Sequence, residues 1–108
     1  MVNSRRVGKD GERAFGKLLD DRGYQAFRRP RGESGDDYTA IDKDGRAWSV
    51  EVKNTTSLMY SHFMQCRDNA SGKNRMLAWH PRKWGFRKET FVVFLWPRGG
   101  DAEVQLWK

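Results

Sequence analysis

The residues from Asp36 to Lys53, DDYTAIDKDGRAWSVEVK, form two runs of alternating polar and apolar side chains around the tripeptide KDG. Alternation of this kind predicts strands with one buried face, and an Asp-Gly pair between two such runs predicts a β-hairpin. This hairpin constrains the fold most, because its register decides which side chains share a face.

Two loops fit the hairpin. If residues 43–45 form a three-residue loop that Gly45 closes in the left-handed conformation, Asp42 pairs with Arg46. Asp37 then lies opposite Glu51. A two-residue loop over 44–45 shifts the pairing by one residue and turns Asp37 to the apolar face.

In that second register Asp36 takes the place of Asp37 and faces Lys53. A third interpretation needs no site at all, because Glu51 and Lys53 would be ordinary charged residues on the solvent-facing side of an edge hairpin. The hairpin sequence alone leaves these alternatives open.

The three-residue loop separates two faces of different chemistry. One carries Asp37, Thr39, Ser49, Glu51 and Lys53, and the apolar one carries Tyr38, Ala40, Trp48, Val50 and Val52. Carboxylates directly opposite each other have Cβ atoms about 5 Å apart and repel unless a cation binds between them. Oxygen ligands suit Mg²⁺ or Mn²⁺, so this face predicts a divalent-metal site, with Lys53 within reach of a phosphate.

Hydrophobic periodicity predicts further elements along the chain. A helix over 10–22 has its apolar residues at helical spacing and ends at Gly23, and a short strand follows over 24–28. Met59, Phe63 and Cys66 also recur at helical spacing and predict a helix whose apolar side chains join the core.

The chain beyond Cys66 is harder to interpret. Residues 75–80 and 91–96 have the composition of strands, and a basic segment with the sequence PRKWGFRKE separates them. The sequence does not decide whether this tail completes the sheet, binds DNA or forms a dimer surface.

Composition narrows the class of protein. A chain of 108 residues with 5 tryptophans suits one domain over 1–108, and its net charge of +7 favours a polyanion such as nucleic acid as partner. One cysteine, no signal-peptide pattern and no apolar run of about 20 residues predict a cytoplasmic protein without a membrane span.

Four segments, GKDGERAF, ESGDDYTA, VEVKNT and FMQC, together resemble the PD-(D/E)xK nuclease superfamily. Within it they are most similar to the archaeal-type and phage Holliday junction resolvases. The resemblance implies an α/β fold with a restriction-endonuclease-like core, in which helices flank a mixed central β-sheet in the order αβββαβ.

The resemblance also implies the site. Asp37 and Glu51, with the backbone carbonyl of Val52, would hold Mg²⁺, for which Mn²⁺ can substitute. Glu12 would complete the shell directly or through water, although an acid there could simply favour the helix dipole. Lys53 would orient or deprotonate the attacking water or stabilise charge in the transition state.

The remaining implied residues would contact DNA or support catalysis. Ser34 matches a loop serine of resolvases and Gln65 a glutamine of the following helix, although a turn residue and a surface amide are equally good interpretations. The expected DNA-binding set is Arg28, Arg29, Arg31, Ser34, Gln65, Lys83, Trp84 and Arg87.

The implied activity is a Mg²⁺-dependent, structure-selective DNA endonuclease that acts as a homodimer on four-way or other branched DNA and leaves 5′-phosphates. One alternative is the same nuclease core on another DNA substrate, in nicking, repair or restriction. A second is a non-catalytic basic module that only binds nucleic acid.

Overall fold

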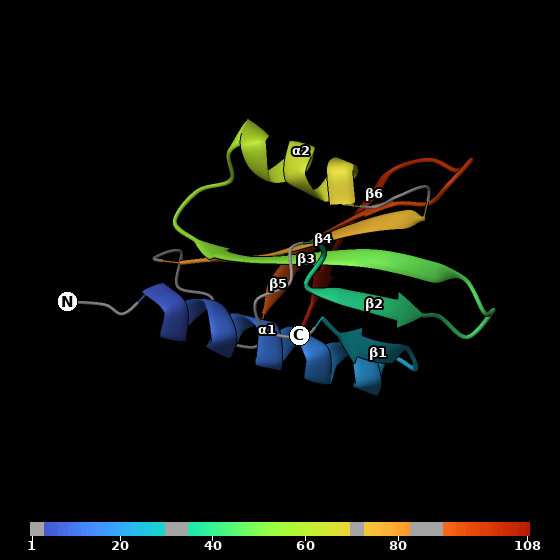
Figure 1. The fold of residues 1–108 in the computed structure, drawn as a ribbon, viewed down its shortest axis with the longest axis horizontal. Helices are drawn as coiled ribbons and strands as arrows, with labels where there is room; N and C mark the ends of the chain where they lie inside the picture. The colour runs from blue at the N-terminus through green and yellow to red at the C-terminus, as the bar shows by residue number, and fades with distance from the viewer. Residues whose placement is uncertain (1–3, 30–34, 70–72, 83–89) are drawn as a thin grey trace.

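A computed structural model of the chain describes residues 4–29, 35–69, 73–82 and 90–108. Its elements form a six-stranded sheet between two helices, as Figure 1 shows. In chain order they are α1 (Ser4–Asp21), β1 (Gln25–Arg28), β2 (Tyr38–Ile41), β3 (Ala47–Thr55), α2 (Tyr60–Asn69), β4 (Asn74–Pro81), β5 (Phe91–Trp96) and β6 (Glu103–Trp107).

The strands lie in the order β1-β2-β3-β4-β5-β6. All neighbours are antiparallel except β3 and β4, which are parallel and are connected through α2. This arrangement confirms the predicted fold class, a mixed sheet flanked by helices that is compatible with a restriction-endonuclease-like core. The order αβββαβ is also confirmed, and β5 and β6 extend the sheet beyond it.

The core lies between α1 and the apolar face of the sheet. The hairpin residues predicted to be apolar are all buried there: Tyr38, Ala40, Trp48, Val50 and Val52. The Phe15 ring of α1 packs edge-on against Phe91, at 5.1 Å between ring centroids, and stacks on Trp107 at 5.4 Å. The tail beyond Cys66 therefore contributes strands and core residues to the same sheet.

The opposite face of the sheet is covered in part by α2. Phe63 of α2 packs edge-on against Phe94 and Trp96 of β5, with ring centroids 5.3 and 5.8 Å apart. Cys66 of α2 is buried, with its thiol 3.6 Å from the Met76 carbonyl of β4. This helix therefore covers the face that carries Ser49 and Glu51, as Figure 1 shows for the two layers.

Two details of the predicted helices were wrong. The first helix begins at Ser4 and not near residue 10, since its first turns are polar and have no apolar stripe to mark them. Met59 was expected in the core but is 60 % exposed, because α2 begins only at Tyr60. Neither helix in the described ranges combines the length and apolar composition needed to cross a bilayer.

The packing of α1 on the hairpin depends on a glycine. The Tyr38 hydroxyl donates a hydrogen bond to the backbone carbonyl of Glu12 at 2.8 Å. A Cβ atom at Gly16 would lie only 2.6 Å from the same hydroxyl oxygen. The Tyr38 ring is held in the core and cannot swing away cheaply, so the helix can approach the sheet this closely only with glycine here.

We therefore expect Gly16→Ala to destabilise the protein by about 1–3 kcal/mol through overpacking, although alanine normally stabilises a helix interior. Urea unfolding followed by circular dichroism measures the change. In a Tyr38→Phe background the hydroxyl is absent and the nearest ring atom, Cζ, lies 3.1 Å from the new Cβ, so the same substitution should cost clearly less. An equal cost in both backgrounds would show that the close contact is not the cause.

Candidate active site

The observed hairpin register is the one that places both acids of the predicted site together. The Asp42 amide donates to the Arg46 carbonyl at 2.9 Å, and Gly45 has φ = +81°. These are the features of the three-residue loop, so the register with a two-residue loop is wrong. Ser49 and Glu51 consequently lie on the face covered by α2.

Asp37 lies immediately before β2, outside the paired ladder, which ends at Tyr38 and Val50. Its amide donates to the Val50 carbonyl at 2.9 Å, and its carboxylate Oδ2 accepts a hydrogen bond from the Val52 amide at 2.7 Å. The carboxyl groups of Asp37 and Glu51 also share a hydrogen bond. The two acids therefore meet through their side chains and not as a paired position of the ladder.

Glu51 is only 1 % exposed although it carries an ionisable group. It lies in the middle of β3, between the paired strands β2 and β4, and contributes to raising the pKa of the buried Cys66 thiol to about 12, an increase caused mainly by burial. A buried carboxyl is costly unless it is neutralised or bonded. The hydrogen bond with Asp37 provides one such interaction.

The pKa of Asp37 is raised to about 6, chiefly because the carboxyl is buried. The Val52 amide lowers this pKa, the negative charge of Glu12 raises it, and the positive charge of Lys53 lowers it. Perturbed carboxyl groups of this kind cluster at functional sites. The electrostatic influence of Glu12 and Lys53 places both near the acid pair.

Lys53 and Gln65, which the sequence resemblance implied separately, contact each other in the structure. The Lys53 ammonium donates to Gln65 Oε1 at 2.7 Å, and this bond joins β3 to α2. The amide can hold the ammonium without neutralising it, so the positive charge stays available at the acid pair.

Glu12 was expected to complete the shell of the cation, and in the structure it pairs with an arginine. Its Oε2 forms an ion pair with Arg28 Nη2 at 2.9 Å, across the contact of α1 with β1. Glu12 also lies well inside α1, so the interpretation of an acid in the first helical turn is wrong. Arg28, which was predicted to bind DNA, is the residue that holds the Glu12 carboxylate.

Asp36 and Asp37 have distinct environments. Asp36 is 2 % exposed, pairs with Arg29 and accepts a hydrogen bond from the Ser49 hydroxyl at 2.8 Å. The Asp37 carboxylate instead faces Val52 and Glu51. The pairing of Arg29 with Asp36 was missed, because nothing in the local sequence connects two residues on opposite sides of the loop.

Five predicted contacts fall outside the described residues. They are Arg31 and Ser34 in the segment 30–34, and Lys83, Trp84 and Arg87 in the segment 83–89. Their assignments stay predictions.

The donor atoms at Asp37 and Glu51 fit a hard divalent cation. Two carboxylates, with the Val52 carbonyl, are oxygen ligands, and Mg²⁺ is commonly held by one or two carboxylates while water and phosphate oxygens complete its shell. Over the described ranges, no group of three or more His, Cys, Asp or Glu side chains could hold a metal ion. A cation here would therefore depend on substrate and water for its remaining ligands.

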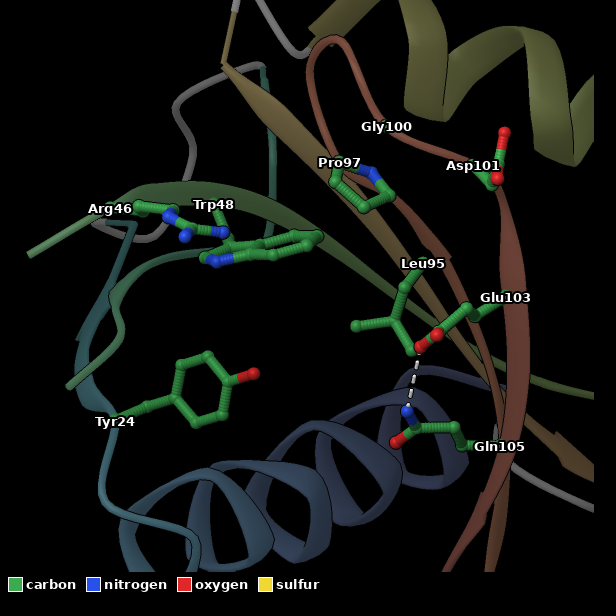
Figure 2. Close-up of a pocket in the computed structure, with 9 residues that line it drawn as sticks. All are labelled: Tyr24, Arg46, Trp48, Leu95, Pro97, Gly100, Asp101, Glu103 and Gln105. Atoms are coloured by element: carbon green, nitrogen blue, oxygen red, sulfur yellow. Dashed lines mark hydrogen bonds between the residues drawn. The ribbon is translucent and has the colours of Figure 1, made fainter. Parts of the chain in front are cut away.

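A pocket of about 530 Å³ lies elsewhere, as Figure 2 shows. Tyr24, Trp48 at the start of β3, and Glu103 of β6 are among the residues that line it. None of the predicted site residues lines this pocket. This pocket is therefore separate from the acid pair.

The raised pKa of Asp37 has a consequence for stability that can be measured without DNA. Since its folded pKa of about 6 exceeds the ordinary value of 3.8, the unfolded chain loses this proton first and stability falls as the pH rises between these values. Without added metal, Asp37→Asn should therefore stabilise the protein above pH 6, by up to about 3 kcal/mol. The gain should vanish below pH 4.

Urea unfolding at pH 4 and pH 8 with a metal chelator measures this difference. Asp101→Asn is the matched control, because Asp101 is exposed on the turn between β5 and β6. Equal stability of wild type and Asp37→Asn at pH 8 would mean that the Asp37 carboxylate is not strained in the metal-free protein.

Comparison with known proteins places the chain in a family. No protein-family profile matches it. It is, however, 31 % identical over 113 residues to the UPF0102 protein of Clavibacter michiganensis subsp. michiganensis (strain NCPPB 382). The match covers 98 % of this chain and 96 % of the relative. Similarity at this level over almost the whole of both chains shows that the protein belongs to the UPF0102 family.

Proposed function

We propose that the protein is a divalent-metal-dependent DNA endonuclease of the PD-(D/E)xK type. The observation that carries this proposal is the hydrogen-bonded pair of Asp37 and Glu51, with Lys53 nearby on the same strand and face as Glu51. Glu51 is buried and Asp37 is half-buried, and acids that share a hydrogen bond in such surroundings are costly for stability and are typical of catalytic sites.

The chemistry of phosphodiester cleavage gives each of these side chains a role. The diester is negatively charged and resists attack, and bound Mg²⁺ would offset the charge that grows in the transition state. Asp37, Glu51 and the Val52 carbonyl would hold that cation. The hydrogen bond from the Val52 amide and the one shared with Glu51 keep the Asp37 carboxylate in one orientation, so less reorganisation is needed when a cation binds.

Lys53 would act on the reacting phosphate or on the attacking water. Its ammonium has three N–H donors, and the hydrogen bond to Gln65 Oε1 at 2.7 Å orients it. Another of these donors can bind a non-bridging phosphate oxygen. Glu12, released from Arg28, would be close enough to act through water, as its effect on the Asp37 pKa indicates.

The proposed substrate is branched DNA, preferably a four-way junction, cut by a homodimer to leave 5′-phosphates. Support for this finer assignment comes from the sequence resemblance to resolvases and from the net charge of +7, which favours a polyanion. Symmetric incision of two strands requires two sites, which a dimer would supply.

A nuclease of the same type with another DNA substrate is the second candidate. The observation that favours it is the pair of strands β5 and β6, which follow the αβββαβ order and complete the sheet. These strands are the part of the fold in which the sequence departs from the resolvase pattern.

The activity test compares a labelled four-way junction with a linear duplex of the same arms, with and without Mg²⁺. We expect paired, Mg²⁺-dependent cuts near the branch point, and a loss of about 100-fold or more in Glu51→Gln and in Lys53→Ala. Glu103→Gln and Lys73→Ala are exposed controls of the same chemistry and should retain activity.

The outcomes separate the candidates. Equal cutting of junction and duplex would favour a nuclease of another specificity. Binding of both DNAs without any cleavage, over a range of Mg²⁺ and Mn²⁺ concentrations, would favour a non-catalytic binding module and reject the enzymatic proposal.

Cation binding can also be tested without substrate. At neutral pH, Mn²⁺ at about 100 times its dissociation constant should stabilise the wild type by about 2.7 kcal/mol, because only the folded site binds it. The same addition should have almost no effect on Glu51→Gln. Equal stabilisation of both proteins, measured by thermal unfolding, would place the cation elsewhere.

A further inference from the structure

We propose that Arg29 and Asp36 position the Asp37 carboxylate, so that Arg29 serves the metal site as a positioning residue and not as a DNA-phosphate ligand. This role rests on the proposed function, because it concerns the residue that would hold the cation. It differs from the sequence-based prediction, in which Arg29 was one of the DNA-binding arginines.

The Arg29 side chain is bonded to Asp36 at two different atoms. Arg29 Nε donates to the Asp36 backbone carbonyl at 2.9 Å and to its carboxylate Oδ1 at 3.1 Å, and Nη2 donates to the same Oδ1. The other carboxylate oxygen, Oδ2, accepts from the buried Ser49 hydroxyl at 2.8 Å. Asp36 is thereby held at its backbone and at both carboxylate oxygens, between the end of β1 and the middle of β3.

The backbone of Asp37 is held by the same two strands. The Arg29 amide donates to the Asp37 carbonyl at 3.0 Å, and the Asp37 amide donates to Val50 at 2.9 Å. With the residue before it clamped and its own peptide groups bonded on both sides, Asp37 has few ways to turn its carboxylate away from Val52. Groups held in this way lose little freedom when a ligand binds.

The chain turns close over the Arg29 guanidinium. Gly35 has φ = +131°, and a Cβ atom there would lie 2.7 Å from the Arg29 Cζ and Nε atoms. Glycine is therefore favoured by the backbone conformation, and any other residue here would also have to displace the Arg29 guanidinium. The sequence Gly35-Asp36-Asp37 is thus a turn residue, a clamped acid and a presented acid, in that order.

A phosphate contact would conflict with these bonds. Asp36 is 2 % exposed, and moving the guanidinium to DNA would leave the buried Asp36 carboxylate with the Ser49 hydroxyl but without its cation. Separating a buried ion pair costs more than one exposed phosphate contact contributes. Arg28 differs, because 43 % of its side chain is exposed and its partner Glu12 is partly exposed as well. Of these two neighbouring arginines, Arg28 is the one free to exchange partners.

The test compares Arg29→Gln with Arg28→Gln, which removes the same charge from the next residue without touching Asp36. The first readout is amide hydrogen exchange in the metal-free protein, because the Val52 amide reports the position of the Asp37 carboxylate directly. We expect exchange at Val52 to be about tenfold faster in Arg29→Gln, with the amides of β5 unchanged, and unchanged at Val52 in Arg28→Gln.

The second readout separates cation binding from DNA binding. Arg29→Gln should weaken Mn²⁺ binding, measured by calorimetry, by about tenfold, while its metal-free affinity for the DNA junction and the salt dependence of that affinity stay within twofold of wild type. Loss of one phosphate contact would instead reduce the salt slope by about one. That result with unchanged Mn²⁺ binding would overturn the proposal, as would unchanged exchange at Val52.

The test still decides if the variant does not fold or if the protein is not a nuclease. If Arg29→Gln does not fold, Arg29→Lys keeps the charge but not the forked donors, and the same faster exchange at Val52 is expected; its absence overturns the proposal. If the wild type binds no Mn²⁺ and cuts no DNA, the proposed nuclease function fails, and the exchange data still decide whether Arg29 positions Asp37.

Discussion

The burial of the Glu51 carboxyl beside Asp37 is the constraint on which the rest of the site depends. A buried ionisable group needs a bonded partner, and a second carboxylate is an unfavourable one unless a proton or a cation lies between them. In the structure the two groups share a hydrogen bond, and burial raises the pKa of Asp37 to about 6. The site is thus arranged to bind positive charge, which is the property that the proposed function uses.

The two faces of the sheet have different roles: one forms the hydrophobic core and the other carries the proposed site. On one face α1 packs closely against the hairpin, with the Tyr38 hydroxyl bonded to the backbone of α1 and the aromatic ring of Phe15 against β5 and β6. On the other face α2 covers Glu51 and bonds Lys53 through Gln65. Substitutions on the first face are expected to affect unfolding, and those on the second the proposed cation and substrate.

The arginines near the loop after β1 show how similar residues acquire different roles. Arg28 and Arg29 are adjacent and equally basic, yet Arg28 pairs with a partly exposed glutamate of α1 and Arg29 with a buried aspartate. Asp36 and Asp37 differ in the same way. In each case the difference is one of burial and of partners from other strands, which neighbouring positions in a sequence cannot reveal.

Patterns of neighbouring residues in the sequence were enough to predict several elements of this fold. The alternation with a period of two and the Asp-Gly turn predicted the hairpin and limited it to two registers, because side-chain direction and turn geometry depend on a few adjacent residues. The observed pairing is one of these two registers. The polar start of α1 and the exposed Met59 escaped the same rules, because a hydrophobic pattern marks the buried side of a helix and not its first residue.

Only the tertiary structure decided which hydrogen-bond and ion-pair partners the charged and polar residues of the site have. The bonds of Glu12 with Arg28, of Asp36 with Arg29 and Ser49, and of Lys53 with Gln65 join elements that are distant along the chain. Such contacts form because α1, the end of β1 and α2 are packed against one sheet, and each charged group then takes the best donor or acceptor within reach. The sequence alone contains the candidates for these pairs, but packing determines which of them meet.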